Sequence, residues 1–170
     1  MIFLGYKEIL KIKGVNKMEK DKLEELLKVW SERLRITPTW DVKLELVDNI
    51  NWEKNGDIKI DCDGRKAIVM LNNINPKLEN IEETIVHELM HLKMYPLDQV
   101  AECLIISNFK KDTPEYKFAY AQFFCALEPT VEELAKCFLS QYGENKEISF
   151  GRCRSVKSFN ELFDGLRKLE

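Results

Sequence analysis

The chain has 170 residues, of which 45% are hydrophobic and 32% are charged, and its formal net charge is −3. This length suits one domain with a sizeable core, and the mixed charges predict neither a nucleic-acid-binding patch nor a membrane-binding surface. The amino-terminal stretch MIFLGYKEILKIKG has no basic residue before its short apolar run and no small-residue cleavage site after it. It therefore predicts neither a signal peptide nor a membrane span, and a cytoplasmic location is the default expectation.

The first part of the chain predicts a helix and then three strands. Residues 1–15 form an amino-terminal arm without clear periodicity, and apolar residues at helical spacing follow over residues 16–34. The segment WDVKLELVD alternates apolar and polar residues, which is typical of a half-buried strand. Residues 56–72 predict a hairpin that turns at Asp63-Gly64. The second arm of this hairpin is almost entirely apolar, so we expect both of its faces to be covered.

The rest of the chain predicts helices. One is expected over residues 76–95, ended by Pro96, and another over residues 97–109. Thr113 and Pro114 are typical of a helix start, and the helical pattern then continues to Tyr142 with an interruption at Pro129. This order predicts an α+β fold, with helices packed on one side of an antiparallel or mixed sheet. The domain is expected over residues 16–142, followed by a carboxy-terminal tail over residues 143–170.

The cysteines predict no disulfide framework, because they are odd in number and form no CxxC pair. We expect free thiols, four of them small core residues. The five cysteines are Cys62, Cys103, Cys125, Cys137 and Cys153.

The pentad HELMH contains the only two histidines of the chain, His87 and His91. Residues four apart lie on one face of a helix, so the two imidazoles can bind one Zn²⁺ ion. Glu88 lies beside them, where it can act as a general base. Zinc lowers the pKa of a bound water, and Glu88 is expected to accept its proton during attack on a carbonyl.

A catalytic zinc ion needs a third protein ligand, and no third histidine exists in the chain. The segment LEPTVEELA carries Glu128 and Glu132 four residues apart, one turn of a helix. We expect Glu128 as the ligand and Glu132 as the hydrogen-bond acceptor that orients a ligand imidazole. Glu132 itself, Glu133 and Glu102 are the alternative third ligands.

On these segments the chain resembles the gluzincin metallopeptidases, specifically the small minigluzincin group. The resemblance rests on WDVKLELVD, AIVMLN, ETIVHELMHL and LEPTVEELA, and it extends over roughly residues 30–138. It implies a zincin-like fold with His87, His91 and Glu128 as zinc ligands and Glu88 as general base. It also implies that the strand Ala67–Asn72 is an edge strand, along which a peptide or protein substrate would pair by β-augmentation.

The sequence therefore predicts a zinc-dependent metallopeptidase of endopeptidase type. The resemblance further implies a latent enzyme, in which a terminal segment such as residues 143–170 covers the cleft. Cys153, between two arginines that favour a thiolate, is a candidate inhibitory zinc ligand, with an ordinary unreactive thiol as the alternative. The alternative function is a zinc-binding regulatory or interaction module without peptidase activity. The sequence does not fix an oligomeric state.

Overall fold

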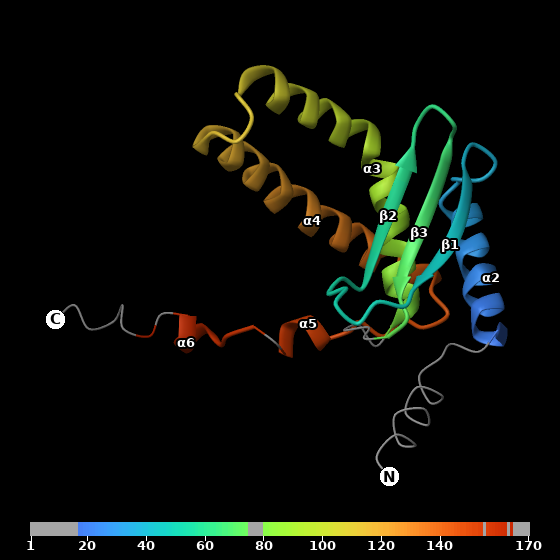
Figure 1. The fold of residues 1–170 in the computed structure, drawn as a ribbon. Coiled ribbons are helices and arrows are strands. Elements are labelled where there is room, and N and C mark those ends of the chain that lie inside the picture. The colour runs from blue at the N-terminus through green and yellow to red at the C-terminus, as the bar shows by residue number, and fades with distance from the viewer. Residues whose placement is uncertain (1–16, 75–79, 155, 163, 165–170) are drawn as a thin grey trace, which may run out of the picture.

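The computed structural model describes residues 17–74, 80–154, 156–162 and 164 (Figure 1). The predicted amino-terminal arm and the expected helix start near Pro76 lie outside the described residues. The elements in chain order are α2 (Lys17–Arg33), β1 (Asp41–Val47), β2 (Gly56–Asp61), β3 (Lys66–Asn72), α3 (Ile81–Asn108), α4 (Pro114–Tyr142), α5 (Gly151–Arg154) and α6 (Phe159–Leu162). This order confirms the α+β class, the helix before the sheet, the three strands and the helix start at Pro114. None of the described helices has the length and apolar character needed to cross a membrane.

The sheet has the order β1-β3-β2, with β1 parallel and β2 antiparallel to β3. The expectation that Ala67–Asn72 is an edge strand is therefore wrong, because β3 bonds to a neighbour on each side. The parallel pairing of β1 with β3 leaves β2 at one edge of the sheet. Both β1 and β2 are edges of the described sheet, and β2 is the edge strand that contacts α3.

The two faces of β3 are buried to different degrees. Ala67, Val69 and Leu71 are buried, whereas Ile68 and Met70 on the opposite face are only half-buried. The expectation that both faces of this strand are covered is therefore wrong. The helices that contact the sheet are α2 and α3, which also contact each other, so they form one layer on the buried face.

The core lies between this face of β3 and the apolar sides of three helices. Trp30 of α2, Val69 of β3, Ile85 and Leu89 of α3 and Val131 of α4 are all completely buried. Burial of large apolar side chains such as these is the main favourable contribution to folding. Consequently the middle of α3 is fixed from three directions.

The helix α3 continues through Pro96, so the expected break into two helices at that residue is wrong. Proline removes one backbone hydrogen bond and commonly bends a helix without ending it when neighbouring elements support both halves. Here α4 packs along α3. Figure 1 shows α3 changing direction between the part behind the sheet and the part that extends beyond it beside α4.

The helix α4 likewise continues through Pro129, against the expected interruption. Thr130, the next residue, donates its hydroxyl to the carbonyl of Ala126 at 2.7 Å. Glu128 and Glu132 therefore lie on consecutive turns of one helix. The buried residues Leu127, Val131, Ala135 and Leu139 define the side of α4 that packs on the core.

The segment that follows α4 is attached to the start of α3. The side chain of Asn80 donates to the carbonyls of Asn145 and Glu147, at 3.0 and 2.8 Å. The buried carboxylate of Glu82 accepts from the backbone N–H groups of Glu144 and Asn145. The buried carboxylate of Glu83 accepts from the backbone N–H of Ser149 at 3.0 Å. We call residues 144–149 the strap.

The cysteines are free thiols, as expected, but all five are exposed. The expectation that four of them belong to the core is therefore wrong. The core is filled instead by leucine, isoleucine, valine and tryptophan side chains from the helices and β3.

Candidate metal centre

The helix α3 presents both histidines on the side opposite its most buried residues. Asn80 caps the helix by accepting from the backbone N–H of Glu82 at 3.1 Å. Ile85 and Leu89 are completely buried, whereas the side chains of His87 and His91 are 17% and 16% exposed. The imidazoles are thus held by a rigid helix yet reach the edge of the core.

The two imidazoles point the same ring nitrogen at a common point. Nε2 of His87 and Nε2 of His91 lie 3.2 Å apart. The carboxylate of Glu128 lies 3.7 Å from the first of these atoms and 3.6 Å from the second. Ligand atoms of the three residues all fall within 4.8 Å of one another. The structure therefore brings together the three residues that the sequence proposed as ligands.

This geometry fits a tetrahedral zinc ion. Zinc–nitrogen bonds of 2.0–2.1 Å at a tetrahedral angle separate two ligand nitrogens by about 3.3 Å, close to the observed spacing. Two imidazoles and one carboxylate are also the donor set of several catalytic zinc sites. The Glu128 side chain is 46% exposed, so a fourth position on this side can be reached from solvent.

Glu132 lies behind His87, one turn after Glu128. Its Oε2 atom is 3.0 Å from Nδ1 of His87. In the neutral tautomer in which Nδ1 donates to this carboxylate, Nε2 carries the lone pair that a metal requires. This is the contact expected of the residue that orients a ligand imidazole. The hydrogen bond from His87, opposed by burial and assisted by Lys136, lowers the pKa of Glu132 to about 2.

The pKa values of the two histidines differ because hydrogen bonds to carboxylates raise only that of His87. Burial lowers the pKa of His87, but hydrogen bonds to Glu128 and Glu132 outweigh it and raise the value to about 9. Burial and the neighbouring charge of His87 lower the pKa of His91. In the metal-free site one imidazolium is therefore held among the acidic groups, in the place where a cation would bind.

Glu88 lies beside the histidines and faces β2. Its side chain is 6% exposed, and burial, more than any neighbouring charge, raises its pKa to about 7. A β-carbon built on Gly56, the first residue of β2, would lie 2.6 Å from Oε1 of Glu88. The absence of a side chain at Gly56 therefore lets the edge strand approach the expected base.

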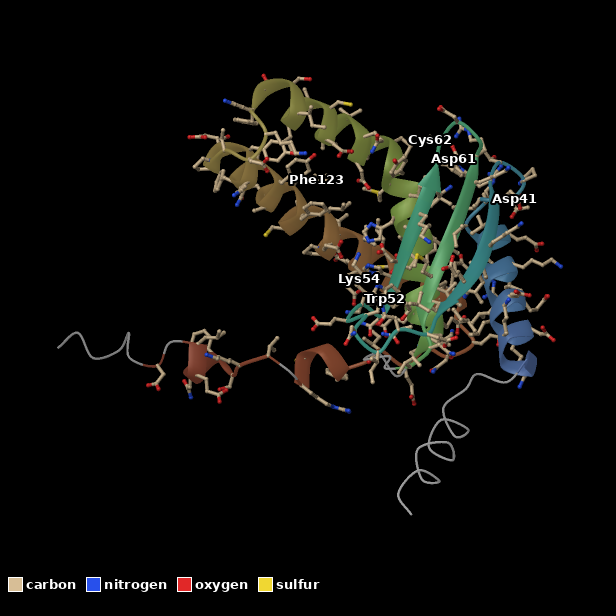
Figure 2. All side chains as sticks on the ribbon, viewed as in Figure 1. Asp41, Trp52, Lys54, Asp61, Cys62 and Phe123 are labelled. Carbon is tan, nitrogen blue, oxygen red and sulfur yellow. The ribbon has the colours of Figure 1, made fainter. Side chains whose placement is uncertain are left out.

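A charged pair near this position joins the loop before β2 to the strand itself. Lys54 and Asp57 form an ion pair at 2.7 Å, and both of their charges influence the pKa values of Glu88 and His91. The side chain of Asn72 binds the carbonyls of Trp52 and Lys54 and thereby holds the loop. Figure 2 shows Trp52 and Lys54 at the end of the sheet where β2 begins, with Asp61 and Cys62 at the other end.

The alternative ligands lie elsewhere or are engaged elsewhere. Glu102 accepts from Gln99 at 3.0 Å and from the hydroxyl of Tyr120 at 3.1 Å. Glu133 is exposed, and neither acid belongs to the His87 cluster. Cys153 lies exposed in α5 and is also outside the cluster. Its role as an inhibitory ligand remains a prediction.

Two residues near the centre were not identified from the sequence. Lys136 forms an ion pair with Glu132 at 2.7 Å, and the four-residue spacing of the two in the sequence could have predicted this pair. No sequence pattern could have predicted the role of Gly56, because its contact with Glu88 depends on how β2 packs on α3.

Comparison with known proteins gave no match: no family model fits the chain, and no curated protein or solved structure is significantly similar to it.

Proposed function

We propose that this protein is a zinc-dependent metallopeptidase with a zincin-like fold, as the sequence resemblance implies. The observation that carries the proposal is the convergence of His87, His91 and Glu128 on one point, with Glu88 one residue along the same helix. A purely structural zinc site usually has four protein ligands and needs no buried acid beside it.

His87, His91 and Glu128 would hold the zinc ion, which supplies Lewis acidity for hydrolysis of a peptide carbonyl. Glu88 would accept the proton of the attacking water on its carboxylate and later return it to the leaving amine. Burial suits Glu88 to this role, because its pKa of about 7 allows both protonation states near neutral pH. Glu132 would keep the proton of His87 on Nδ1 throughout.

The peptide substrate is proposed to bind along β2 rather than along β3. β2 is an edge strand, and its first residue, Gly56, is next to Glu88. An extended peptide added to this edge would bring its backbone past the base, with main-chain hydrogen bonds supplying affinity. The substrate strand implied by the resemblance is thus replaced by its neighbour in the sheet.

Latency through the tail remains part of the proposal, with a narrower segment responsible. The strap is bonded to the start of α3, whereas the backbones of α5 and α6 do not closely approach the other described elements. A segment after Ser149 could cover the centre while the hydrogen bonds of the strap stay intact.

The test measures zinc content and peptide hydrolysis in the same preparations, both in the full chain and, because that chain is proposed to be latent, in protein without residues 150–170. Wild-type protein is expected to bind one zinc ion per chain, and His87→Ala to lose it. Glu88→Gln is expected to keep zinc and lose hydrolysis of an unstructured protein such as casein. A wild-type protein that binds no zinc would refute the proposal. If the full chain binds zinc, and neither it nor protein without residues 150–170 hydrolyses the substrate, the result would favour a zinc-binding interaction module.

A further inference from the structure

Lys136 lies behind the candidate metal centre, one turn after Glu132 on α4. Its Nζ atom is 2.7 Å from Oε1 of Glu132, and the other oxygen of that carboxylate, Oε2, is 3.0 Å from Nδ1 of His87. One carboxylate is thus held at both oxygens, by an ammonium group on one side and an imidazole on the other. A carboxylate held in this way cannot turn from the imidazole without breaking a charged hydrogen bond.

We propose that Lys136 is a positioning residue, which holds the Glu132 carboxylate so that His87 directs Nε2 toward the metal. The inference rests on the proposed zinc site. Lys136 would be a further functional residue of this site, in addition to the three ligands, the general base Glu88 and Glu132.

The Lys136–Glu132 pair differs from an ordinary ion pair on a helix surface. Lys20 and Glu24 of α2 have the same four-residue spacing, but they are 3.4 Å apart and their side chains are 47% and 51% exposed. Lys136 and Glu132 are each 35% exposed and closer together. Exposed pairs contribute little to stability, so the value of the second pair lies in the orientation of the carboxylate.

The charge of Lys136 also acts on a second acid. Glu83 is 1% exposed and accepts from the backbone N–H of Ser149 in the strap. Burial raises the pKa of Glu83, the charge of Glu132 acts in the same direction, and the charge of Lys136 opposes both. Without Lys136, the repulsion between the carboxylates of Glu83 and Glu132 would lose one of the two positive charges that oppose it, those of Lys136 and His87. We expect Glu132 to turn away from His87, because its side chain has access to solvent.

Charge and position predict opposite effects on metal affinity. The positive charge of Lys136 repels a zinc ion, so its removal would strengthen binding if charge alone mattered. Loss of the held carboxylate would weaken binding, because partners that orient a ligand histidine commonly change metal affinity 10–100-fold. If Lys136 positions Glu132, its replacement by a neutral residue should therefore weaken zinc binding rather than strengthen it.

The experiment uses the full chain and zinc alone, with a chromophoric chelator as competitor. Lys136→Met is expected to weaken zinc binding about tenfold, at the low end of the usual range because Lys136 is one residue further from the metal. Lys136→Arg keeps the charge and the donors and is expected to restore affinity. Lys20→Met removes the comparison pair on α2 and should leave affinity unchanged.

Nuclear magnetic resonance provides a readout that a merely structural role would not affect. The chain has only two histidines, so the imidazole signals are easily assigned. In zinc-loaded protein the Nδ1 proton of His87 should exchange slowly with water, and Lys136→Met should accelerate that exchange while Lys136→Arg should not. Thermal unfolding of the metal-free variants identifies any variant that fails to fold, and Lys136→Gln then replaces Lys136→Met.

Each outcome separates the two proposals. If wild-type protein binds no zinc, the proposed function fails. If wild-type protein binds zinc and Lys136→Met binds it equally well or more tightly, the proposed function stands and the role of Lys136 is refuted. Weaker binding by Lys136→Met that Lys136→Arg does not restore would also refute the positioning role.

Discussion

The backbone of Gly56 runs directly against the side chain of Glu88. A β-carbon at position 56 would lie 2.6 Å from Oε1 and 3.0 Å from Cγ of that glutamate, and 2.7 Å from Cγ2 of Thr84. These separations are too short for any other residue to fit without movement. The first residue of the edge strand and the expected base are therefore matched in shape, which connects the position of β2 to the chemistry of α3.

Gly56→Ala is expected to displace Glu88 or the start of β2 and to reduce hydrolysis at least about tenfold, because misplacement by about 1 Å can cost a factor of 100. Zinc content should be unchanged, since the new β-carbon would meet Glu88 and Thr84, which are not proposed zinc ligands. Hydrolysis rates and zinc content check the prediction. The matched control is Gly64→Ala, whose β-carbon would meet the side chain of Asp61 at the opposite end of β2 (Figure 2). Full activity in Gly56→Ala would contradict the proposed role of this close approach.

Glu88→Gln is expected to lower hydrolysis by at least about 100-fold, the usual contribution of a general base. The amide has nearly the same shape and removes a buried charge, so the metal-free variant should be no less stable than wild-type protein. Calorimetry and activity assays on one preparation check both parts. Retained hydrolysis would show that another group accepts the proton.

Removal of zinc is expected to lower the melting temperature. A ligand present at about 1,000 times its Kd stabilises the folded state by about 4 kcal/mol. Each kcal/mol shifts Tm by about 2–4 °C for a domain of this size. A chelator should therefore lower Tm by roughly 8–16 °C in wild-type protein and hardly at all in Glu128→Ala. Glu133→Ala, which removes an exposed acid on the same helix, should respond like wild-type protein.

The sequence predicted those parts of the fold that depend on neighbouring residues. Alternation in WDVKLELVD and around Asp63-Gly64 gave the strands, and the Thr113-Pro114 pair gave the start of α4. The breaks expected at Pro96 and Pro129 do not occur, because packing between α3 and α4 outweighs one lost hydrogen bond in each helix. The order of the strands depends on long-range pairing, so local patterns could not identify β2 as the edge.

The candidate site also has a part that the sequence predicts and a part that depends on long-range packing. The spacing of His87 and His91 on one helix places them on one face, so the sequence alone sufficed for this pair. The approach of Glu128 to both imidazoles needs α4 to pack against α3 in the observed register. The contact of Gly56 with Glu88 joins elements whose relative position no local pattern encodes.

Asn80→Ala is expected to destabilise the protein by about 3 kcal/mol, from loss of the helix cap and of two hydrogen bonds at about 1 kcal/mol each. The amide group of Asn80 donates to Asn145 and Glu147 of the strap, while its oxygen caps α3. Asn80→Ser keeps an oxygen for the cap and loses only the two strap bonds, so it should cost about 2 kcal/mol. Urea unfolding measures both values. Equal stability of the two variants would mean that the cap contributes nothing.

Deletion of residues 150–170 is expected to leave the melting temperature within about 2 °C of that of the full chain. The reason is that the backbones of α5 and α6 do not closely approach other described elements, so the change of stability should stay within about 0.5 kcal/mol. Deletion of residues 143–170 would also remove the strap and leave the buried carboxylates of Glu82 and Glu83 without several donors. The free energy of unfolding is therefore expected to fall by several kcal/mol.

If the tail is inhibitory, only the shorter deletion can reveal it, as increased hydrolysis by a stable protein. Cys153→Ser in the full chain then distinguishes a thiolate ligand from steric cover, because only the former predicts activation by this single change. An unchanged hydrolysis rate after the shorter deletion would contradict tail-mediated latency.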